Sequence, residues 1–495
     1  MDFRLTKFTV LSSIIWKFME RIGVQGIQFI VMIVLARMLL PDDFGLIVLV
    51  TIFISIAAVM TQGGFSAALI QQKNVDAVDL SSVFYLNLFI AAILYVLLFF
   101  AAPSIALFFE LPTLSSILRI LAITLFFNAF SGIQQTIIAR EFQFKKLFAS
   151  TLSAAVFAGI VGIVLAYTNY GIWALVGFQL TNQFLVTFIL WFTINWRPKW
   201  LFSFKRIRRL FSYGWKLLAA SLIDTIDANL RGLLIGKLFH PAVLGFYNRG
   251  EQFPSLVVNN INGSIQAVLF PTLSSHKEDK RRVKEMVRRA IVTSSFIIFP
   301  MMVGLAVIAE PLVLLLLTEK WLPAVPFIQI FCAGYALWPI HTANLQAINA
   351  LGRSDIFLKL EIIKKIVGVV VLIISIPFGV YAVASSIVVG GIVAAFINAF
   401  PNLKLLDYRI REQLRDITPS LGLALVMGAV IFPIQWLQLP ALVTLVAQVV
   451  VGMILYIGLA ALFRLECFSY LLKTLKELVK RRRSGQVPVS RKISV

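Results

Sequence analysis

Charged residues, cysteines and histidines are all scarce in this chain, and each scarcity excludes a class of protein. Only 14% of the 495 residues are charged, against about 25% in an ordinary soluble domain, while 59% are hydrophobic. Two cysteines, Cys332 and Cys467, are too few for a disulfide framework. Three histidines are scattered along the chain, and neither a His-Glu-x-x-His pattern nor a phosphate-binding glycine loop with lysine occurs. We therefore expect no metal, no cofactor and no enzymatic activity.

The charge that is present is strongly unbalanced, with a formal net charge of +22. A nucleic-acid-binding protein concentrates such charge on a polar domain, and this sequence contains no polar domain. The mean hydropathy of +0.90 instead predicts a chain that is solvated by lipid. Nucleic acid is therefore excluded as a partner, and membrane lipids are expected as one.

Apolar runs of about 20 residues, long enough to cross a bilayer, predict an all-α polytopic membrane protein with about fourteen transmembrane helices. Twelve is the alternative, because several runs have poorly defined ends and the two runs around Pro377 are separated by a very tight turn. The predicted helices are centred near residues 27, 53, 95, 126, 157, 183, 227, 258, 303, 337, 371, 391, 426 and 451.

Basic residues alternate between the predicted loops in the way that orients membrane proteins. With the N-terminus inside, 37 of the 45 Lys and Arg residues fall in cytoplasmic segments. The opposite loops hold only Arg37, Lys237, Arg249 and Lys320. One missed helix would scramble this asymmetry, so it predicts an even number of spans with both termini in the cytoplasm. The anionic inner leaflet is the expected partner of the excess charge.

The first apolar stretch is interrupted by Lys17, Glu20 and Arg21, which argues against a cleaved signal peptide. We therefore expect the first helix to be a transmembrane helix of the mature protein. At the other end, Phe468, Leu471 and Leu475 share one face of a basic helix, which predicts a helix lying on the inner membrane surface. The predicted organisation is an N-terminal lobe at 1–196, a basic cytoplasmic linker at 197–215, a C-terminal lobe at 216–402, a helix pair at 403–463 and a basic amphipathic cytoplasmic tail at 464–495.

A repeat with a constant offset of 200 residues links the two predicted lobes. The segment LARMLLPDDFGLI at 35–47 aligns with IGKLFHPAVLGFY at 235–247, so that Pro41 matches Pro241 and Gly45 matches Gly245. The alignment gives seven identities over 36 ungapped positions. The proline and glycine matches fall at corresponding helix ends, which strengthens the alignment in so apolar a chain.

Because six spans separate the repeats, the two six-helix lobes share one orientation and should be related by a pseudo-two-fold axis along the membrane normal. Two-bundle transporters have this plan, with a substrate cavity between lobes that rock to give alternating access. A duplicated scaffold without transport is the alternative, and the charges within the predicted spans argue against it.

Seven charged residues lie within predicted spans. Facing lipid, they would together cost roughly 20 kcal/mol, so they cannot all face lipid. Lys17 with Glu20 and Asp227 with Arg231 stand at helical spacing for ion pairs. We expect the charges to line a water-filled cavity that favours an anion. The seven residues are Lys17, Glu20, Arg21, Arg119, Asp224, Asp227 and Arg231.

Arginine suits an anion site because its planar fork matches phosphate oxygens and stays charged. Arg21, Arg119 and Arg231 are the leading anion contacts, with Lys17 beside them. The acids Glu20, Asp224 and Asp227 are the candidates to bind a coupling proton or sodium ion. The polar residues Asn128, Gln134 and Asn229 would suit a sugar. The alternative is that the charges only lock helices together or reach the inner surface, and that the amides only join helices.

Three segments resemble a known family: LARMLLPDDFGLIVL at 35–49, NYGIWALVGFQL at 169–180 and LGFYNRGEQFPSLVVNNINGSIQAVLFPTLSS at 244–275. They are similar to the polysaccharide transporter family of the multidrug, oligosaccharidyl-lipid and polysaccharide flippase superfamily, in the branch of exopolysaccharide exporters similar to the colanic acid exporter. The branch pattern Gly-x-Tyr-x-Arg stands here as Gly245, Tyr247 and Arg249. The chain departs from the pattern at Gly250, where the branch often has alanine.

The resemblance implies a V-shaped bundle of two lobes that carries an undecaprenyl-pyrophosphate-linked oligosaccharide from the inner to the outer leaflet of the bacterial cytoplasmic membrane. It would serve exopolysaccharide or lipopolysaccharide assembly, with the polysaccharide polymerase machinery as a partner. The alternatives are a multidrug or cation antiporter of the same superfamily and a membrane enzyme of glycan assembly. A basic cavity disfavours the first, and the lack of a large extramembrane domain disfavours the second.

Overall fold

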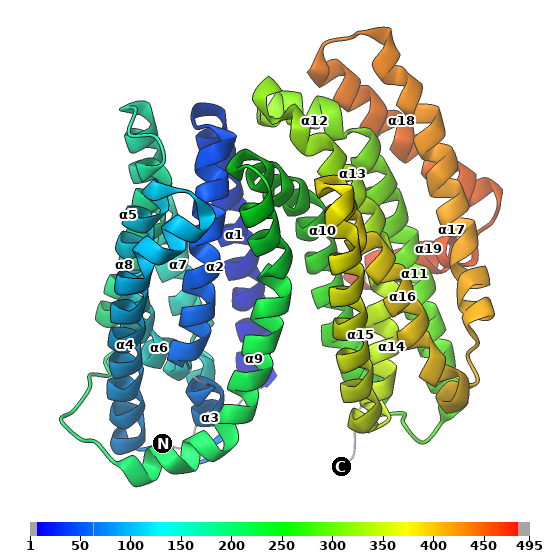
Figure 1. The fold of residues 1–495 in the computed structure, drawn as a ribbon. Coiled ribbons are helices and arrows are strands. Elements are labelled where there is room, and N and C mark those ends of the chain that lie inside the picture. Colours follow the sequence, from blue (N-terminus) through cyan, green and yellow to red (C-terminus); the bar gives the residue numbers. More distant parts are fainter. Residues whose placement is uncertain (1–6, 63, 484–495) are drawn as a thin grey trace. The chain divides into compact units, whose positions relative to one another are not determined.

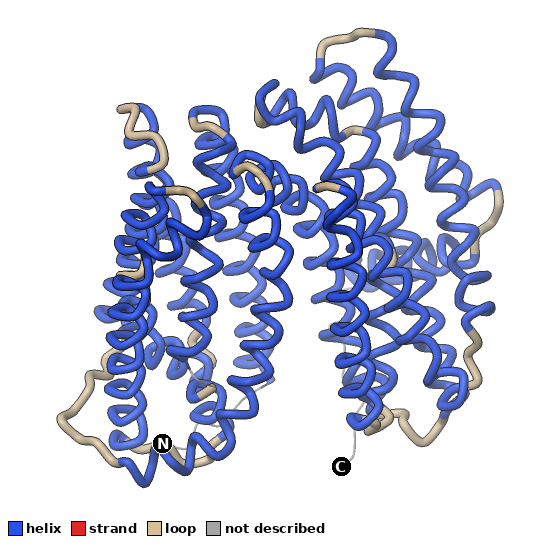
Figure 2. Tube along the Cα trace, viewed as in Figure 1, coloured by secondary structure: helices blue, strands red, loops and turns tan. Residues whose placement is uncertain are grey.

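The computed structural model describes residues 7–62 and 64–483, and within those ranges it contains helices and no strand (Figure 2). The first half of the chain forms α1 Lys7–Met38, α2 Pro41–Gln62, α3 Phe65–Gln71, α4 Ala77–Phe109, α5 Pro112–Leu121, α6 Thr124–Glu141, α7 Phe144–Tyr167, α8 Trp173–Thr193 and α9 Phe204–Leu238. The second half forms α10 Pro241–Ser274, α11 Lys280–Val307, α12 Ala309–Leu316, α13 Val325–Ala336, α14 Trp338–Ala350, α15 Ser354–Ser375, α16 Val380–Leu406, α17 Ile410–Ile431, α18 Ala441–Leu462 and α19 Glu466–Arg483. Three short 3₁₀ helices lie at Glu319–Ala324, Ile376–Phe378 and Phe432–Leu437.

The chain divides into two compact units. The first unit comprises Met1–Asn248 with Leu316–Lys320, and the second comprises Arg249–Leu315 with Trp321–Val495. In the first unit α7 packs between α1 and α8, while α9 packs along α2 and reaches α3 and α4 with its first turns (Figure 1). In the second unit α11 packs on α13, α14 and α17, and α16 packs on α13, α14 and α15. The predicted lobe boundaries remain a prediction.

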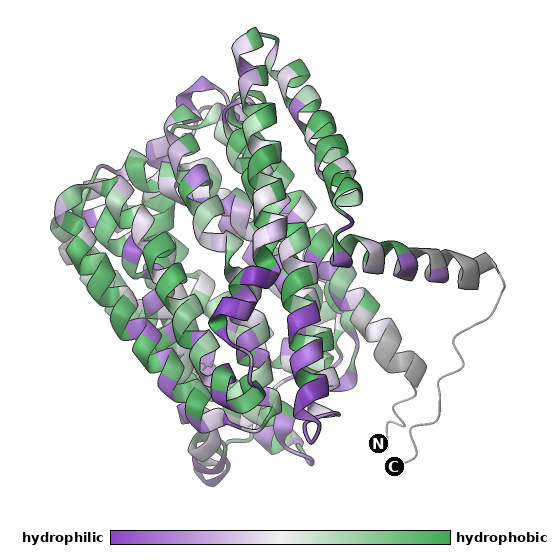
Figure 3. Cartoon of the chain, turned by 90° about the vertical axis from the view of Figure 1, so that its right-hand side faces the viewer, coloured by the Kyte–Doolittle hydropathy of each residue, from purple (hydrophilic) through white to green (hydrophobic). Residues whose placement is uncertain are grey.

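Eleven helices or helix pairs in the described part of the chain are long and apolar enough to cross a membrane. Figure 3 shows the apolar residues running along the helices, with many hydrophilic residues at helix ends and in the connections. Helices α9, α10 and α15 are outside this set, although they have 35, 34 and 22 residues and could each span a bilayer by length. The polytopic helical fold is confirmed, and the count of fourteen, which these three would complete, is not.

The two copies of the sequence repeat meet each other in the first unit. Pro41 begins α2 and Pro241 begins α10, the position where the missing N–H of proline costs no helical hydrogen bond. A Cβ atom on Gly45 would overlap the carbonyl oxygen of Pro241, and a Cβ atom on Gly245 would overlap that of Pro41. The contact is therefore reciprocal, and glycine is required at both positions because backbone meets backbone. Next to it, His240 Nδ1 lies 3.0 Å from Asp42 Oδ1.

The matched basic residues of the repeat, Arg37 and Lys237, make similar contacts with helix ends. Arg37 Nε donates to the carbonyl oxygen of Leu316, at the end of α12, over 2.9 Å. Lys237 Nζ donates to the carbonyl oxygen of Phe108, at the end of α4, over 2.6 Å and pairs with Glu110 at 2.9 Å. Both cations thus satisfy carbonyl groups that a helix C-terminus leaves without a partner, where the helix dipole also favours positive charge.

The second unit has its own core, in which buried residues of α11, α14, α16, α17 and α18 come together around Phe299, Tyr408 and Tyr456. At its centre, amide side chains of three helices bond one another: Asn402 Nδ2 donates to Asn344 Oδ1 over 2.6 Å, and Asn344 Nδ2 donates to Gln413 Oε1 over 2.9 Å. Buried amides of this kind hold helices together in an apolar setting.

Helix α19 packs on the core of the second unit through Cys467, Phe468 and Leu471. Its predicted place on the membrane surface remains a prediction, and residues 484–495 of the tail lie outside the described residues.

Replacing Gly45 by Ala tests the reciprocal contact. The new methyl group must push α2 and α10 apart, so we expect a loss of about 1–3 kcal/mol in stability and a lower midpoint of thermal unfolding in detergent. Gly458→Ala is the matched control, because a Cβ atom on Gly458, inside α18, meets nothing within 4 Å. Equal unfolding midpoints for Gly45→Ala and wild type would show that the backbones do not touch at Gly45.

Candidate functional site

The charges predicted within the first span lie in the first half of α1. Lys17 Nζ donates to Glu20 Oε2 over 2.8 Å, which confirms the ion pair expected from their spacing. The Lys17 side chain is exposed, whereas that of Glu20 is 15% exposed. The Arg21 side chain is exposed on the same helix. Of these three residues, Arg21 is the one outside the ion pair.

The charges predicted in the seventh span lie on α9. Asp224 is exposed, and Asp227 and Arg231 are half-buried. The predicted pair between Asp227 and Arg231 remains a prediction. Asn229 donates from Nδ2 to the carbonyl oxygen of Thr225 over 2.7 Å, one turn earlier in the same helix. All of these residues belong to the first unit, as does α1.

The charged residues of α1 and α9 lie at different distances from the C-terminal ends of their helices. Met38 and Leu238 end the two helices and are matched by the repeat. At 1.5 Å per residue, Arg21 stands about 25 Å from the end of α1. Asp224 stands about 21 Å and Arg231 about 10 Å from the end of α9. Charge is therefore available over much of the thickness of a hydrocarbon core, which is about 30 Å.

Arg119 lies on α5 and is held by α4. Its Nε donates to the carbonyl oxygen of Phe99 over 3.1 Å, and its guanidinium carbon lies 4.4 Å from the centre of the Phe99 ring. A carbonyl bond and a cation–π contact together keep this cation against a neighbouring helix. These contacts give Arg119 a structural role, and its predicted role as an anion contact remains untested.

The polar residues predicted on the fourth span, Asn128 and Gln134, both lie on the side of α6 that packs against α8. Gln183 Nε2 donates to Asn128 Oδ1 over 2.6 Å, which links the two helices. Gln134 is fully buried, beside Phe130 and Trp191. Both amides therefore join helices in this structure, and their predicted role as sugar contacts remains untested.

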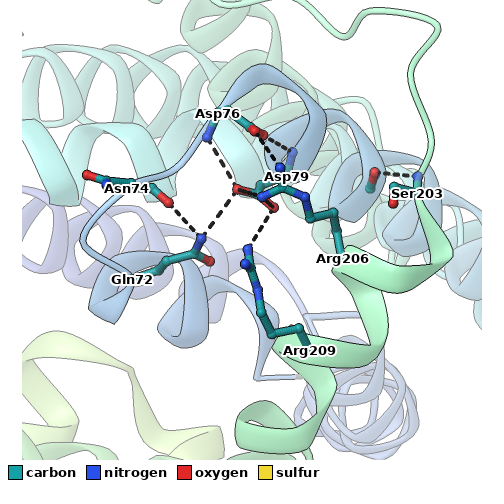
Figure 4. Close-up of polar contacts among 8 residues, drawn as sticks. Gln72, Asn74, Asp76, Asp79, Ser203, Arg206 and Arg209 are labelled. Atoms are coloured by element: carbon teal, nitrogen blue, oxygen red, sulfur yellow. Dashed lines mark hydrogen bonds and ion pairs between the residues drawn. The ribbon is translucent and has the colours of Figure 1, made fainter.

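A polar cluster that the sequence analysis did not identify lies where α4 begins (Figure 4). Asp79 is fully buried, and its Oδ1 lies 3.3 Å from Arg206 Nη1 and 3.3 Å from Arg209 Nη2. Asp76 caps α4 in a reciprocal capping box with Asp79. The pKa of the Asp76 carboxyl is lowered, mainly because the Asp79 backbone amide donates a hydrogen bond to it. Burial opposes this shift by a smaller amount, and the nearby Arg206 adds to it.

The same cluster docks the basic segment predicted as a linker. The backbone amide of Lys199 donates to Ser81 Oγ over 3.1 Å, and that of Ser203 donates to Ser82 Oγ over 2.9 Å. From Phe204 onward the segment is already part of α9. The carboxylate of Asp79 thus ties the start of α9 to the start of α4. The only sequence signal for this contact is an acid in a helix that is otherwise apolar, with arginines more than a hundred residues away.

No group of three or more His, Cys, Asp or Glu residues that could hold a metal ion occurs among the residues that the structure describes. The polar features of the chain are therefore charges on apolar helices, helix-end ties and buried amides. Such features can bind and orient a polar molecule.

Comparison with known proteins identifies the family. The family model described as "Polysaccharide biosynthesis protein" matches residues 34–326, more than half of the chain. The chain belongs to this family.

Two curated relatives and one solved structure extend the comparison. The chain is 22% identical over 348 residues to the succinoglycan biosynthesis transport protein ExoT of Rhizobium meliloti, covering 70% of each protein. It is 23% identical over 391 residues to the lipopolysaccharide biosynthesis protein WzxC of Escherichia coli, covering 78% of this chain and 79% of that one. The structure of the lipid II flippase MurJ in an inward closed conformation superposes with a TM-score of 0.73 at 17% identity, covering 92% of this chain and 98% of that one. The likeness to MurJ shows the fold.

This polysaccharide biosynthesis protein is therefore a multi-pass membrane transporter and not an enzyme of glycan assembly. The predicted resemblance to the polysaccharide transporter branch is confirmed.

The residues that carried the resemblance are packing positions in this family member. Tyr247 and Arg249 are 5% and 7% exposed within α10, and Leu273 is fully buried. Arg249 Nη1 donates to Gln252 Oε1 one turn later. Placing Arg249 in an outer loop was wrong, because the residue lies inside α10 and is 7% exposed. A Cβ atom on Gly250 would overlap Phe327 of α13, which accounts for glycine at the position where the branch often has alanine.

Replacing Asp79 by Ala tests the docking of α9 on α4. The change removes the shared acceptor of two arginines and half of a capping box, so we expect a loss of about 2–3 kcal/mol in the free energy of unfolding. Trypsin should also cut faster after Lys199, which is followed by Trp200. Glu278→Ala is the control, since the Glu278 side chain is 91% exposed and the change should cost less than about 0.5 kcal/mol. Unaltered cleavage at the basic segment would contradict the docking.

Proposed function

We propose that this protein is a flippase that moves an undecaprenyl-pyrophosphate-linked oligosaccharide from the inner to the outer leaflet of the cytoplasmic membrane by alternating access. The transported unit would feed exopolysaccharide or lipopolysaccharide assembly. Family membership and the name of WzxC support a role in polysaccharide biosynthesis, and the name of ExoT supports transport. The observation that carries the proposal is the presence of charged residues at different depths along α1 and α9.

The chemistry of the cargo fits those residues. A pyrophosphate carries negative charge that guanidinium groups bind through paired hydrogen bonds. Arg21 is exposed on α1, and Arg231 lies about 15 Å nearer to the predicted outer side on α9. An anion passing from one to the other would find a cation at each stage. The polar headgroup then avoids the hydrocarbon, where unsatisfied polar groups cost several kcal/mol each.

Three of the predicted substrate contacts are held by a neighbouring helix or fully buried. Arg119 is held by α4, and Asn128 bonds Gln183. Gln134 is fully buried. We propose Arg21, which is exposed, and Arg231, which is half-buried, as the principal anion contacts, with Lys17 and Asn229 beside them, and assign the other three residues a secondary role.

The orientation that we propose places both termini in the cytoplasm. The support is the distribution of Lys and Arg residues, 37 of which fall in the predicted cytoplasmic segments. In this orientation the Asp79 cluster and the beginning of α9 lie at the inner side. The ends of α1 and α9, with Arg37 and Lys237, lie at the outer side.

Arg21→Ala and Arg231→Ala, made singly, test the anion path. Each removes a charge that the passing pyrophosphate requires, so polysaccharide output from cells lacking the native gene should fall at least tenfold at equal membrane levels of the protein. Arg411→Ala is the control, because Arg411 is an exposed base at the beginning of α17 and should leave output unchanged. Full output from both arginine variants would reject the assignment.

Asp224→Asn tests ion coupling. Asp224, Asp227 and Glu20 are the acids that we propose to bind a proton or a sodium ion, and Asp224 is the exposed one on α9. The amide cannot change its charge, so flipping of a lipid-linked glycan in reconstituted vesicles should lose its response to a pH or sodium gradient. The acid on the same helix provides the comparison, because Asp227→Asn should have the smaller effect if its pairing with Arg231 holds it ionised. A normal gradient response in Asp224→Asn would remove this residue from the coupling mechanism.

A further inference from the structure

A second polar site lies in the second unit, far along the sequence from α1 and α9. A cavity of about 910 Å³ opens where α11 begins, α16 ends and α17 begins. Its walls carry six bases and four acids together with two leucines. The lining residues are Lys280, Arg281, Lys284, Glu285, Arg288, Lys404, Leu405, Leu406, Asp407, Glu412, Arg415 and Asp416.

Most acids of the cavity form ion pairs with bases that also line it. Arg288 Nε donates to both carboxylate oxygens of Asp416 at 3.0 Å, and Asp416 also accepts from the buried Tyr408 hydroxyl over 2.7 Å. Lys284 pairs with Glu412 at 2.9 Å. Burial and Asp416 raise the pKa of Tyr408, which keeps its hydroxyl a neutral donor. These contacts hold the paired side chains in place, and the paired charges cancel one another.

The bases on the rim are not neutralised in this way. In the described part of the chain, no hydrogen bond or ion pair engages the side chains of Lys280, Lys404 and Arg415. They come from three different helices, α11, α16 and α17, and all three are exposed. Asp407 is the one acid of the cavity whose carboxylate likewise has no such contact, so the rim keeps a net positive charge.

Apolar side chains adjoin these bases. Leu405 and the largely buried Leu406 line the cavity, and Leu403 and Leu414, the sequence neighbours of Lys404 and Arg415, are 38% and 44% exposed. A free phosphate in water would need the cations but not the exposed leucines. The phosphate of a lipid, which carries acyl chains, would use both.

We propose that this cavity binds the phosphate group of an anionic lipid headgroup in the inner leaflet, through Lys280, Lys404 and Arg415. The assignment to the inner leaflet rests on the orientation proposed above. The site differs from the transport path, since the lipid stays in its own leaflet and serves as a ligand of the second unit. Basic pockets between membrane helices at the cytoplasmic side bind headgroups by this combination of charge and apolar contact.

The test measures binding of dioctanoyl phosphatidylglycerol to the purified full-length protein in a neutral detergent. The variant changes Lys280, Lys404 and Arg415 together to Gln. Affinity for the lipid should fall at least tenfold. A matched control changes Lys359, Arg409 and Arg411 to Gln, three exposed bases that do not line the cavity, and it should retain affinity within twofold.

Two further arms separate the possible ligands. Dioctanoyl phosphatidylcholine, which is zwitterionic, should bind at least tenfold more weakly than the anionic lipid. Inorganic phosphate should also bind at least tenfold more weakly, because it gains nothing from the leucines. If inorganic phosphate binds as tightly as the lipid, the lipid assignment is wrong and the cavity is a site for a soluble anion.

A charge-conserving variant provides a second control. The variant Lys280→Arg, Lys404→Arg, Arg415→Lys keeps the charges and should keep lipid affinity, whereas its loss would contradict the proposal. Equal weakening by the cavity variant and the control variant would also overturn it, since binding would then depend on charge alone. None of these measurements requires transport, so a failure of the proposed flippase function would leave their outcome unaffected.

Discussion

The cost of placing charge in hydrocarbon is the constraint on which this structure depends. Each charged side chain on an apolar helix must find a counter-charge, a carbonyl group or water. Glu20 has Lys17, Asp79 has two arginines, and Arg119 has a carbonyl oxygen and an aromatic ring. Arg21 is exposed on α1 and lies outside the Lys17–Glu20 pair. In the proposed flippase, this cation lies beside an aqueous path.

The internal repeat makes a reciprocal contact within the first unit. Because Gly45 and Gly245 each lie against the proline that begins the other helix, α2 and α10 approach backbone to backbone. The matched cations Arg37 and Lys237 bind the ends of α12 and α4 at the corresponding place. A duplicated sequence has therefore been used to make one reciprocal contact. That contact requires glycine at both positions, and proline begins both helices.

Sequence alone predicted the features that depend on local composition. Hydropathy located the apolar helices, spacing predicted the Lys17–Glu20 pair, and family patterns predicted the fold and the pathway. It failed where a residue's surroundings come from distant segments. Arg249 is predicted to lie in an outer loop, yet it is buried in α10. The Asp79 cluster and the cavity beside Arg415 join residues more than a hundred positions apart, and no periodicity within one helix can show that.

Water access to α1 provides the most direct test of this account. In a background with Cys332 and Cys467 changed to Ser, Arg21→Cys and Ile30→Cys can be compared by labelling with a membrane-impermeant maleimide. The two positions lie nine residues apart, on opposite faces of the helix at 100° per residue, and both are exposed. The account predicts rapid labelling at position 21 and little at position 30. Equal protection of both cysteines would mean that Arg21 faces acyl chains, and the proposed path along α1 and α9 would not exist.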